Sequence, residues 1–230
     1  MITEEKVLYE DNHIIVINKA PKEIVQGDIT GDVPLLEHVK EFLKEKYNKP
    51  GNVFVGLPHR LDRPTSGLVL FAKTSKALSR LNLMFRNKDM KKTYWAVVKE
   101  QPPSKKGTLK DYLLKHNEKN KSFVKKVEAE GAKYSELDYE IIAASDRYFL
   151  LKINPKTGRH HQIRAQLANM GCPIKGDLKY GFDRSNPDGS IHLHARRLEF
   201  IHPVSQEKMD IEALTPDEPL WNAFMKLVKH

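Results

Sequence analysis

Short apolar runs and helical periodicities divide the chain into strands and a few amphipathic helices. β-Branched or continuous apolar runs that end at turn residues predict strands, and apolar residues at a spacing of three and four predict helices. The predicted strands cover residues 13–19, 53–57, 68–72, 91–100, 134–143, 148–153 and 191–203. Predicted helices cover residues 35–43, a stretch capped by Thr74 or Ser75, residues 160–170 and a C-terminal stretch that includes Leu220 and Leu227. The chain has no repeat, low-complexity tract or linker, which favours one mixed domain over residues 1–230.

Positive charge is spread along the whole sequence. The formal net charge is +9 and the pI is about 9.4. Residues 104–126 are rich in lysine and poor in apolar residues, so we expect a solvated hairpin or loop that could also face phosphates. Distributed lysine and arginine favour a polyanionic partner, although a basic balance is also common in proteins that merely stay soluble.

Few features connect the chain to membranes, disulfides or metals. Cys172 is the single cysteine, so no intramolecular disulfide can form. The acidic N-terminal sequence is unlike a signal peptide, and no apolar run approaches a membrane span, so we expect a cytoplasmic protein without a membrane partner. The histidines have no acidic or cysteine neighbours at a metal-ligand spacing, and no metal site is predicted.

Asp62 is the first candidate for chemistry. It lies between Arg60 and Arg63 in a turn flanked by two apolar runs, so we expect it near a core. An ionised carboxylate there is costly without cations and hydrogen bonds. The residue is therefore either part of a structural ion pair or a charge kept for chemistry.

Arg164 is the second candidate. It lies at the edge of an apolar helical stripe, which predicts a half-buried guanidinium that needs a carboxylate, and we favour Asp62 as its partner. His160 lies one turn earlier. Lys156 and Arg159 flank the predicted start of this helix, where a phosphate could bind, although a capping turn with exposed bases would look the same.

Tyr94 follows Lys91 and Lys92 on a predicted strand. An aromatic ring among lysines is typical of a surface on which nucleic-acid bases stack, but most strand tyrosines merely pack.

Together these segments resemble the RNA pseudouridine synthases of the RluA type. The sequence HRLDRPTSGLVLFAK, residues 59–73, is similar to the catalytic motif of that family, and KKTYWAVV, residues 91–98, to its tyrosine motif. The stretch at 156–181 resembles its arginine and glycine-aspartate motif, and residues 7–19 and 193–203 also fit. One departure is the Ala20-Pro21-Lys22 sequence after Lys19, where the family usually has a Pro-Ala-Gly-like turn.

The resemblance implies an α+β fold: a single domain with a mixed, mainly antiparallel β-sheet, flanking helices and a basic catalytic cleft. It also implies an isomerase that converts uridines in structured RNA, rRNA or tRNA, to pseudouridine without a cofactor. Because the matching sequence begins close to Met1, we expect no separate N-terminal RNA-binding domain. We expect a monomer that recognises a compact RNA stem-loop.

The resemblance also implies roles for individual residues. Asp62 is the essential carboxylate, which either attacks the anomeric carbon or removes the neighbouring sugar proton. Arg164 pairs with Asp62, and Tyr94 stacks on the flipped uracil and helps to move its proton. Arg60 fills the gap left by the flipped base. Expected RNA contacts, including those suggested by the basic segments above, are Arg60, Lys92, Lys156, Arg159 and His160.

Two other classes of function make different demands on the sequence. A glycoside hydrolase would ordinarily need two carboxylates, and only one buried candidate is visible in the sequence. A non-catalytic RNA-binding or ribosome-assembly protein is the main alternative. A sequence without Asp62 would have favoured this alternative, but the motif at 59–73 contains the aspartate.

Overall fold

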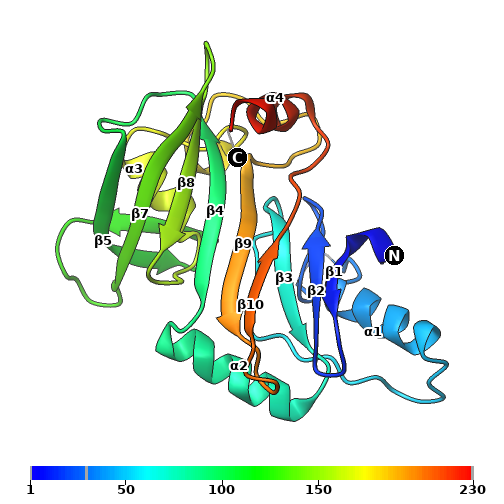
Figure 1. The fold of residues 1–230 in the computed structure, drawn as a ribbon. Coiled ribbons are helices and arrows are strands. Elements are labelled where there is room, and N and C mark those ends of the chain that lie inside the picture. Colours follow the sequence, from blue (N-terminus) through cyan, green and yellow to red (C-terminus); the bar gives the residue numbers. More distant parts are fainter. Residues whose placement is uncertain (1, 29–30, 229–230) are drawn as a thin grey trace. The chain divides into compact units, whose positions relative to one another are not determined.

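A computed structural model describes residues 2–28 and 31–228. The chain divides into two compact units, residues 1–92 with 195–214 and residues 93–194 with 215–230. Ten strands and four α-helices occur in the described part (Figure 1). The α+β class and the mainly antiparallel pairing are therefore confirmed.

The first unit is built around two strands that are buried along almost their whole length. β2 (Ile14–Lys19) pairs antiparallel with β1 (Val7–Glu10) on one side and with β3 (Ser66–Ala72) on the other. All seven residues of β3 are buried, and the apolar run at 68–72, which predicted a strand buried on both faces, forms five of them. At Gly67 (φ 109°) an added Cβ would lie 2.3 Å from the carbonyl oxygen of Ala195, so only glycine permits this close approach of backbones.

The remaining elements of this unit are the short 3₁₀ helix η1 (Glu4–Lys6), α1 (Leu35–Lys46), α2 (Ser75–Asn87) and β10 (Lys208–Glu212). Among them, the helices α1 and α2 agree with the predicted periodicities. The predicted cap of α2 is Thr74, whose hydroxyl oxygen accepts a hydrogen bond from the amide of Ala77 at 3.1 Å. β10 pairs with β9 (Leu193–Ile201), most of which lies in this unit. Both β1 and β10 were missing from the sequence prediction.

In the second unit, the strands follow one another in the antiparallel order β4, β8, β7, β5, β6, of which Figure 1 labels the first four. Their bounds are β4 (Lys91–Val98), β5 (Lys106–His116), β6 (Lys121–Lys125), β7 (Lys133–Ala144) and β8 (Phe149–Pro155). A hairpin or a loop was expected for the lysine-rich segment at 104–126. The structure contains a hairpin there, formed by β5 and β6. Its strand β5 pairs with β7 over eight residues, so the hairpin is an integral part of the sheet.

The helices of this unit pack on the apolar faces of its strands. α4 (Pro219–Leu227) buries Trp221 and Phe224 against Trp95, Val97 and Leu150. The other helices are α3 (Gln162–Asn169) and the short 3₁₀ helix η2 (Leu178–Tyr180). No helix in residues 2–28 or 31–228 is long and apolar enough to cross a bilayer.

One sequence prediction about the candidate motifs was wrong. Residues 53–57 are not a strand: Gly56 forms one isolated bridge with Ala72, Phe54 is 47% exposed, and Pro58 has no amide hydrogen with which to extend the pairing. The helix predicted from about residue 160 to residue 170 is confirmed as α3, which begins at Gln162 because His161 has a left-handed backbone (φ 51°).

Candidate active site

Asp62 lies in the turn that leads into β3, and its side chain is half-buried. The neighbouring Leu61 is 9% exposed and Thr65 is 2% exposed, so the turn is attached to the core on both sides. The carbonyl oxygen of Asp62 accepts a hydrogen bond from the amide of Thr65 at 3.0 Å. The hydrogen-bonded turn thus fixes the backbone position of Asp62, next to the buried start of β3.

Lys19 is the cation that ties this turn to β2. Its side chain is only 1% exposed, and its Nζ donates to the carbonyl oxygens of Ala20 at 2.9 Å, Glu23 at 2.9 Å and Arg63 at 3.2 Å. The amide of Lys22 also donates to the Arg63 carbonyl at 2.8 Å. One buried ammonium therefore holds the loop at 20–23 and the residue directly after Asp62.

Burial lowers the pKa of Lys19 to about 7, and the carboxylates of Glu23 and Asp62 oppose this shift. Three carbonyl acceptors match the three N–H donors of an ammonium group, so this geometry belongs to the protonated form. Glu23 is held in turn by Lys6 at 2.7 Å and by the amide of Ala20 at 2.8 Å. The loop with the unusual Ala-Pro-Lys sequence is thus fixed by charge and by hydrogen bonds.

His59 fastens the other end of the turn to β3. Its Nε2 accepts from the amide of Leu70 at 2.9 Å, and its ring stacks on Phe85 with centroids 4.7 Å apart. Burial lowers its pKa to about 3, with a smaller contribution from the charge of Lys92. The imidazole is therefore neutral near pH 7, as its role as a hydrogen-bond acceptor requires. Lys92 is half-buried with its Nζ 5.8 Å from the Phe85 ring centroid, and burial lowers its pKa as well.

The two arginines that flank Asp62 in sequence are exposed and point to other residues. Arg60 donates to Oε1 of Gln26 at 3.3 Å, and Arg63 forms an ion pair with Asp32 at 2.6 Å.

Tyr94 lies in the second unit, on β4 opposite Ile153 of β8. Its ring is half-buried and packs against the core cluster that contains Ala96, Ile153 and Ile163. Part of the tyrosine therefore has the packing role that is usual for strands.

Arg164 is more deeply buried than the sequence predicted. It is 4% exposed, because α3 is apolar on two faces: Ile163 and Leu167 pack in one core cluster and Ala165 in another. Its guanidinium forms a bidentate ion pair with Asp177, from Nε to Oδ2 at 2.7 Å and from Nη2 to Oδ1 at 2.9 Å. Asp177 is 1% exposed. The sequence analysis did not identify this partner.

Tyr180 links Arg164 to the β5–β6 hairpin. The Cζ of Arg164 lies 5.0 Å from the centre of its ring, and Nζ of Lys121 lies 4.9 Å from the same point. The hydroxyl oxygen of Tyr180 accepts from the amide of Ser122 at 2.8 Å and lies 3.0 Å from Nδ1 of His161. Burial, followed by the charge of Arg164, lowers the pKa of His161 to about 2, so this ring is neutral.

The segment before α3 is held both by its own polar groups and by hydrogen bonds to β7 and to the β5–β6 hairpin. The Thr157 hydroxyl donates to Oε1 of Gln162 at 2.8 Å, and the Arg159 amide donates to the same oxygen at 3.0 Å. Lys156 forms an exposed ion pair with Asp138 at 2.9 Å. His160 Nδ1 lies 3.0 Å from the Ser122 hydroxyl. Lys156 and Arg159 are exposed at the surface of this turn.

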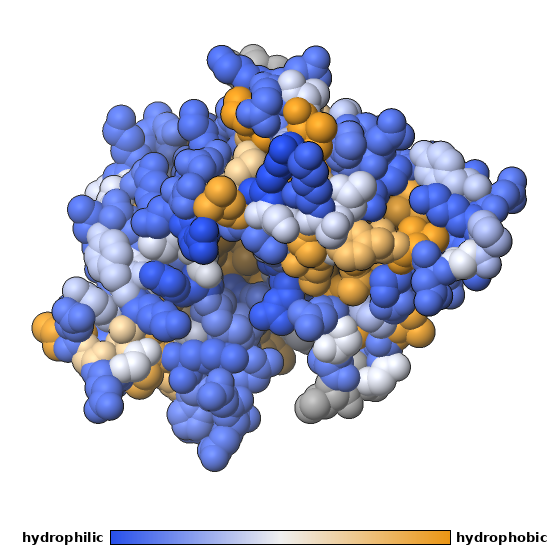
Figure 2. All heavy atoms as spheres, turned by 90° about the horizontal axis from the view of Figure 1, so that it is seen from below, coloured by the Kyte–Doolittle hydropathy of each residue, from blue (hydrophilic) through white to orange (hydrophobic). Residues whose placement is uncertain are grey.

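The structure thus adds Lys19, Asp177 and Tyr180 to the residues that sequence reasoning selected. Asp177 and Tyr180 fall within the third family-like motif, so that motif was the available signal. Nothing in a strand ending in Asn-Lys predicts a buried lysine. Within residues 2–28 and 31–228, no cluster of three or more histidine, cysteine or acidic side chains is arranged to hold a metal. The face drawn in Figure 2 is mainly hydrophilic, with apolar patches between the polar side chains.

Comparison with known proteins extends these observations. A family model described as RNA pseudouridylate synthase matches residues 13–169. The chain is 36% identical over 232 residues to "Ribosomal large subunit pseudouridine synthase C" of Escherichia coli (strain K12), covering 96% of this chain and 69% of that protein. It is 37% identical over 213 residues to the protein of the same name from Yersinia pestis, covering 90% and 64%. The chain therefore spans about two thirds of the length of these curated relatives.

Solved structures with a similar fold include "Human RNA Pseudouridylate Synthase Domain Containing 4". It superposes with a TM-score of 0.78 at 22% identity and covers 93% of this chain and 89% of its own. "Human RNA Pseudouridylate Synthase Domain Containing 1" gives a TM-score of 0.71 at 22% identity, with 95% and 86% covered. At this identity the likeness shows a shared fold.

Proposed function

Because the chain belongs to the RNA pseudouridylate synthase family, we propose that it isomerises uridine to pseudouridine within RNA. Family membership confirms the resemblance indicated by the motifs. In this reaction the bond from the sugar to the ring nitrogen breaks, the uracil turns, and a ring carbon is joined to the sugar. A proton leaves that carbon and one is returned to nitrogen, so the product has the same atoms as the substrate. The reaction needs no redox partner.

The observation that carries the proposal is the family match over residues 13–169, which contains Asp62, Tyr94 and Arg164. In our proposal Asp62 supplies the essential carboxylate, either as the nucleophile at the anomeric carbon or as the base for the neighbouring sugar proton. Both routes need an ionised group that is kept in place. The half-buried turn, which Lys19 and His59 fasten to neighbouring backbone, supports this proposal.

Arg164 is proposed to keep Asp62 ionised and oriented. A guanidinium has five N–H donors in a planar fork, and two of those of Arg164 are directed at Asp177. Its plane is thereby fixed while it retains the capacity to bind another acceptor. Tyr94 is proposed to stack on the uracil and to assist proton transfer through its hydroxyl.

The target uridine must leave its stack, because both its sugar carbon and its base edge have to reach the reacting groups. We propose that Arg60, which is exposed beside Asp62, fills the gap in the RNA. Lys92, Lys156, Arg159 and His160 are proposed to contact the surrounding RNA. Lys156 and Arg159 are exposed at the surface of the second unit, which supports this role, whereas Lys92 is half-buried.

Residues 1–230 are proposed to act as one catalytic domain. The family match runs through both compact units, and each unit supplies part of the motif set. The proposed substrate is a compact stem-loop of ribosomal or transfer RNA. The relatives are named for ribosomal modification, and the net charge of +9 is suited to an RNA backbone.

The test is to map pseudouridine in total RNA from cells that contain or lack the protein. We expect one or a few uridines to lose the modification when the protein is absent and to regain it with the parent gene. Restoration by an Asp62→Asn gene would contradict a catalytic role for that carboxylate. A map that is unchanged in ribosomal and transfer RNA would favour the non-catalytic RNA-binding alternative.

A further inference from the structure

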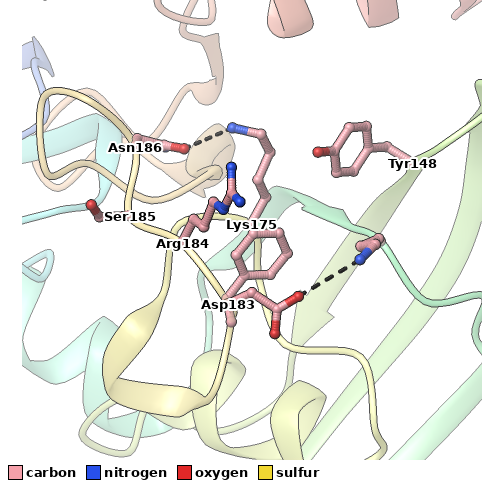
Figure 3. Close-up of a pocket in the computed structure, with 8 residues that line it drawn as sticks. Tyr148, Lys175, Asp183, Arg184, Ser185 and Asn186 are labelled. Atoms are coloured by element: carbon pink, nitrogen blue, oxygen red, sulfur yellow. Dashed lines mark hydrogen bonds and ion pairs between the residues drawn. The ribbon is translucent and has the colours of Figure 1, made fainter.

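A pocket of about 440 Å³ opens in the second unit, and its lining shares no residue with the proposed catalytic groups (Figure 3). Its walls carry three cations, Lys99, Lys175 and Arg184, and two aromatic side chains, Tyr148 and Phe182. We propose that this pocket binds a backbone phosphate of the RNA substrate, away from the uridine that reacts. The inference rests on the proposed function, because RNA is the phosphate-bearing partner.

The charges of the pocket favour an anion. Asp183 is the one acidic residue of the lining, and its carboxylate lies 3.7 Å from Nζ of Lys99. With that pair set aside, Lys175 and Arg184 remain as two positive charges that line the same space. In Figure 3 the Tyr148 hydroxyl points toward the side of the pocket where these two side chains lie, so it can add a neutral donor.

Lys175 is held in place by a chain of hydrogen bonds. Its Nζ donates to Oδ1 of Asn186 at 2.7 Å, and Nδ2 of Asn186 lies 3.1 Å from the Ser190 hydroxyl and 3.0 Å from Nδ1 of His192. Nε2 of His192 lies 3.0 Å from Oε2 of Glu218, which caps α4. The side-chain amide of Asn186 can donate a hydrogen bond to His192 only if Nδ1 carries no proton. The histidine is therefore neutral, with its proton on Nε2.

Backbone geometry supports this arrangement. Lys175 donates its amide to Val97 at 2.9 Å and accepts from His192 at 2.9 Å, so both sides of its backbone are tied to neighbouring segments. At Gly176 (φ 87°) an added Cβ would lie 2.8 Å from Nδ2 of Asn186. The glycine therefore allows Asn186 to approach and to orient the lysine. A solvated surface lysine would need neither the fixed backbone nor the oriented Asn186 amide.

The ammonium of Lys175 is also partly desolvated. Burial lowers its pKa, and the carboxylates of Glu218 and Asp188 act in the opposite direction. A phosphate in the pocket would supply a closer negative charge and additional acceptors. Two residues further along the chain, Asp177 holds Arg164, so a phosphate bound at Lys175 would steady the segment that supports a proposed catalytic group.

The experiment measures RNA affinity in the Asp62→Asn background, where no turnover interferes. The probe is protein-free large-subunit ribosomal RNA made by transcription, titrated at several salt concentrations. Lys175→Met and Arg184→Gln are compared with Lys226→Gln, which removes an exposed charge from α4 of the same unit. Arg184 is exposed, so its variant should fold even if Lys175→Met does not.

We expect each pocket variant to weaken RNA binding by about three- to tenfold and to reduce the salt slope by about one, as loss of one phosphate contact requires. Lys226→Gln should change affinity less than twofold. An Arg184→Gln protein that binds RNA like the control would overturn the proposal. A second titration uses inorganic phosphate without RNA. Binding of phosphate that depends on Lys175 and Arg184, with RNA affinity unchanged in both variants, would instead assign the pocket to a small anion.

These outcomes are independent of the reaction itself. If the parent protein makes no pseudouridine but the pocket variants bind RNA less tightly, the function fails and the pocket stands. If the parent is active and the pocket variants bind normally, the pocket fails and the function stands.

Discussion

Lys19 and Arg164 are both cations inside the protein, 1% and 4% exposed, but their surroundings stabilise them differently. Lys19 faces three neutral backbone carbonyls, whereas Arg164 faces the carboxylate of Asp177 through two parallel bonds. Carbonyl dipoles compensate a buried charge only in part, so the pKa of the lysine falls to about 7. The guanidinium stays protonated because its intrinsic pKa is very high.

The comparison shows two ways of fixing a functional segment. In the first unit a single ammonium group binds backbone carbonyls of two loops. Its disadvantage is that the ammonium can lose its proton near neutral pH. In the second unit an ion pair fixes the plane of a side chain, and its cost is the need for a second buried charge. The first arrangement positions backbone beside Asp62, and the second positions the donors of Arg164 itself.

The largest effect should come from the carboxylate beside the Lys19 network. Asp62→Asn should fold, bind RNA and show no detectable isomerisation, because an amide of the same shape cannot supply the charge. Activity is measured as tritium released from uridine labelled at the exchanging ring carbon, and folding by the melting temperature. Turnover within about tenfold of the parent would remove Asp62 from the chemistry, since loss of a group that enables the reaction should cost far more.

The next effect tests the ion pair of the second unit. Asp177→Asn leaves the Arg164 charge buried without this carboxylate, and we expect a loss of about 3–5 kcal/mol of unfolding free energy. The control is Asp210→Asn, which removes the carboxylate from the exposed Arg197–Asp210 pair and should cost about 1 kcal/mol or less. Both losses are measured by urea unfolding at one pH. Equal losses would mean that burial of the Arg164–Asp177 pair has no special energetic role.

A smaller effect is expected on β4. Tyr94→Phe keeps the ring that packs and stacks but removes the hydroxyl, so turnover should fall by about a hundredfold, which is typical of lost proton-transfer assistance. RNA affinity should stay within about twofold of the parent, as measured by filter binding. Unchanged turnover would reduce Tyr94 to a stacking and packing residue.

The smallest effect is the pH dependence of the unfolding free energy, which should distinguish Lys19 from Arg164. Because the folded pKa of Lys19 is about 7 and the ordinary value is 10.5, the unfolded chain binds more protons between these limits. Unfolding free energy should therefore gain a positive slope with pH from about 7 to 10.5 in the parent. Lys19→Met removes this component and Arg164→Met does not. Urea unfolding at pH 7, 8, 9 and 10 provides the slopes, and parallel curves for the parent and Lys19→Met would contradict the assignment.

Most elements could be predicted because their signals are local. The β-branched run at 13–19, the continuous apolar run at 68–72 and the cap at Thr74 or Ser75 each have a short-range physical cause, and β2, β3 and a helix capped by Thr74 appear in the structure. Residues 53–57 show the limit of this reasoning. Val53 and Val55 are buried like strand residues, but the bridge that this stretch forms in the described part of the chain is the isolated one between Gly56 and Ala72, and no local pattern indicates whether a partner strand is available.

The sequence by itself determined the motif set around Asp62, Tyr94 and Arg164, and with it the family. It also determined the basic charge that suits a polyanion, because composition and short motifs do not depend on the fold. Only the tertiary structure decided that Arg164 pairs with Asp177, that Lys19 is buried against three carbonyls, and that Lys175 turns into a pocket lined by Arg184. Whether a charged side chain is buried depends on which distant segments cover it and offer acceptors, and spacing along the chain does not contain that information.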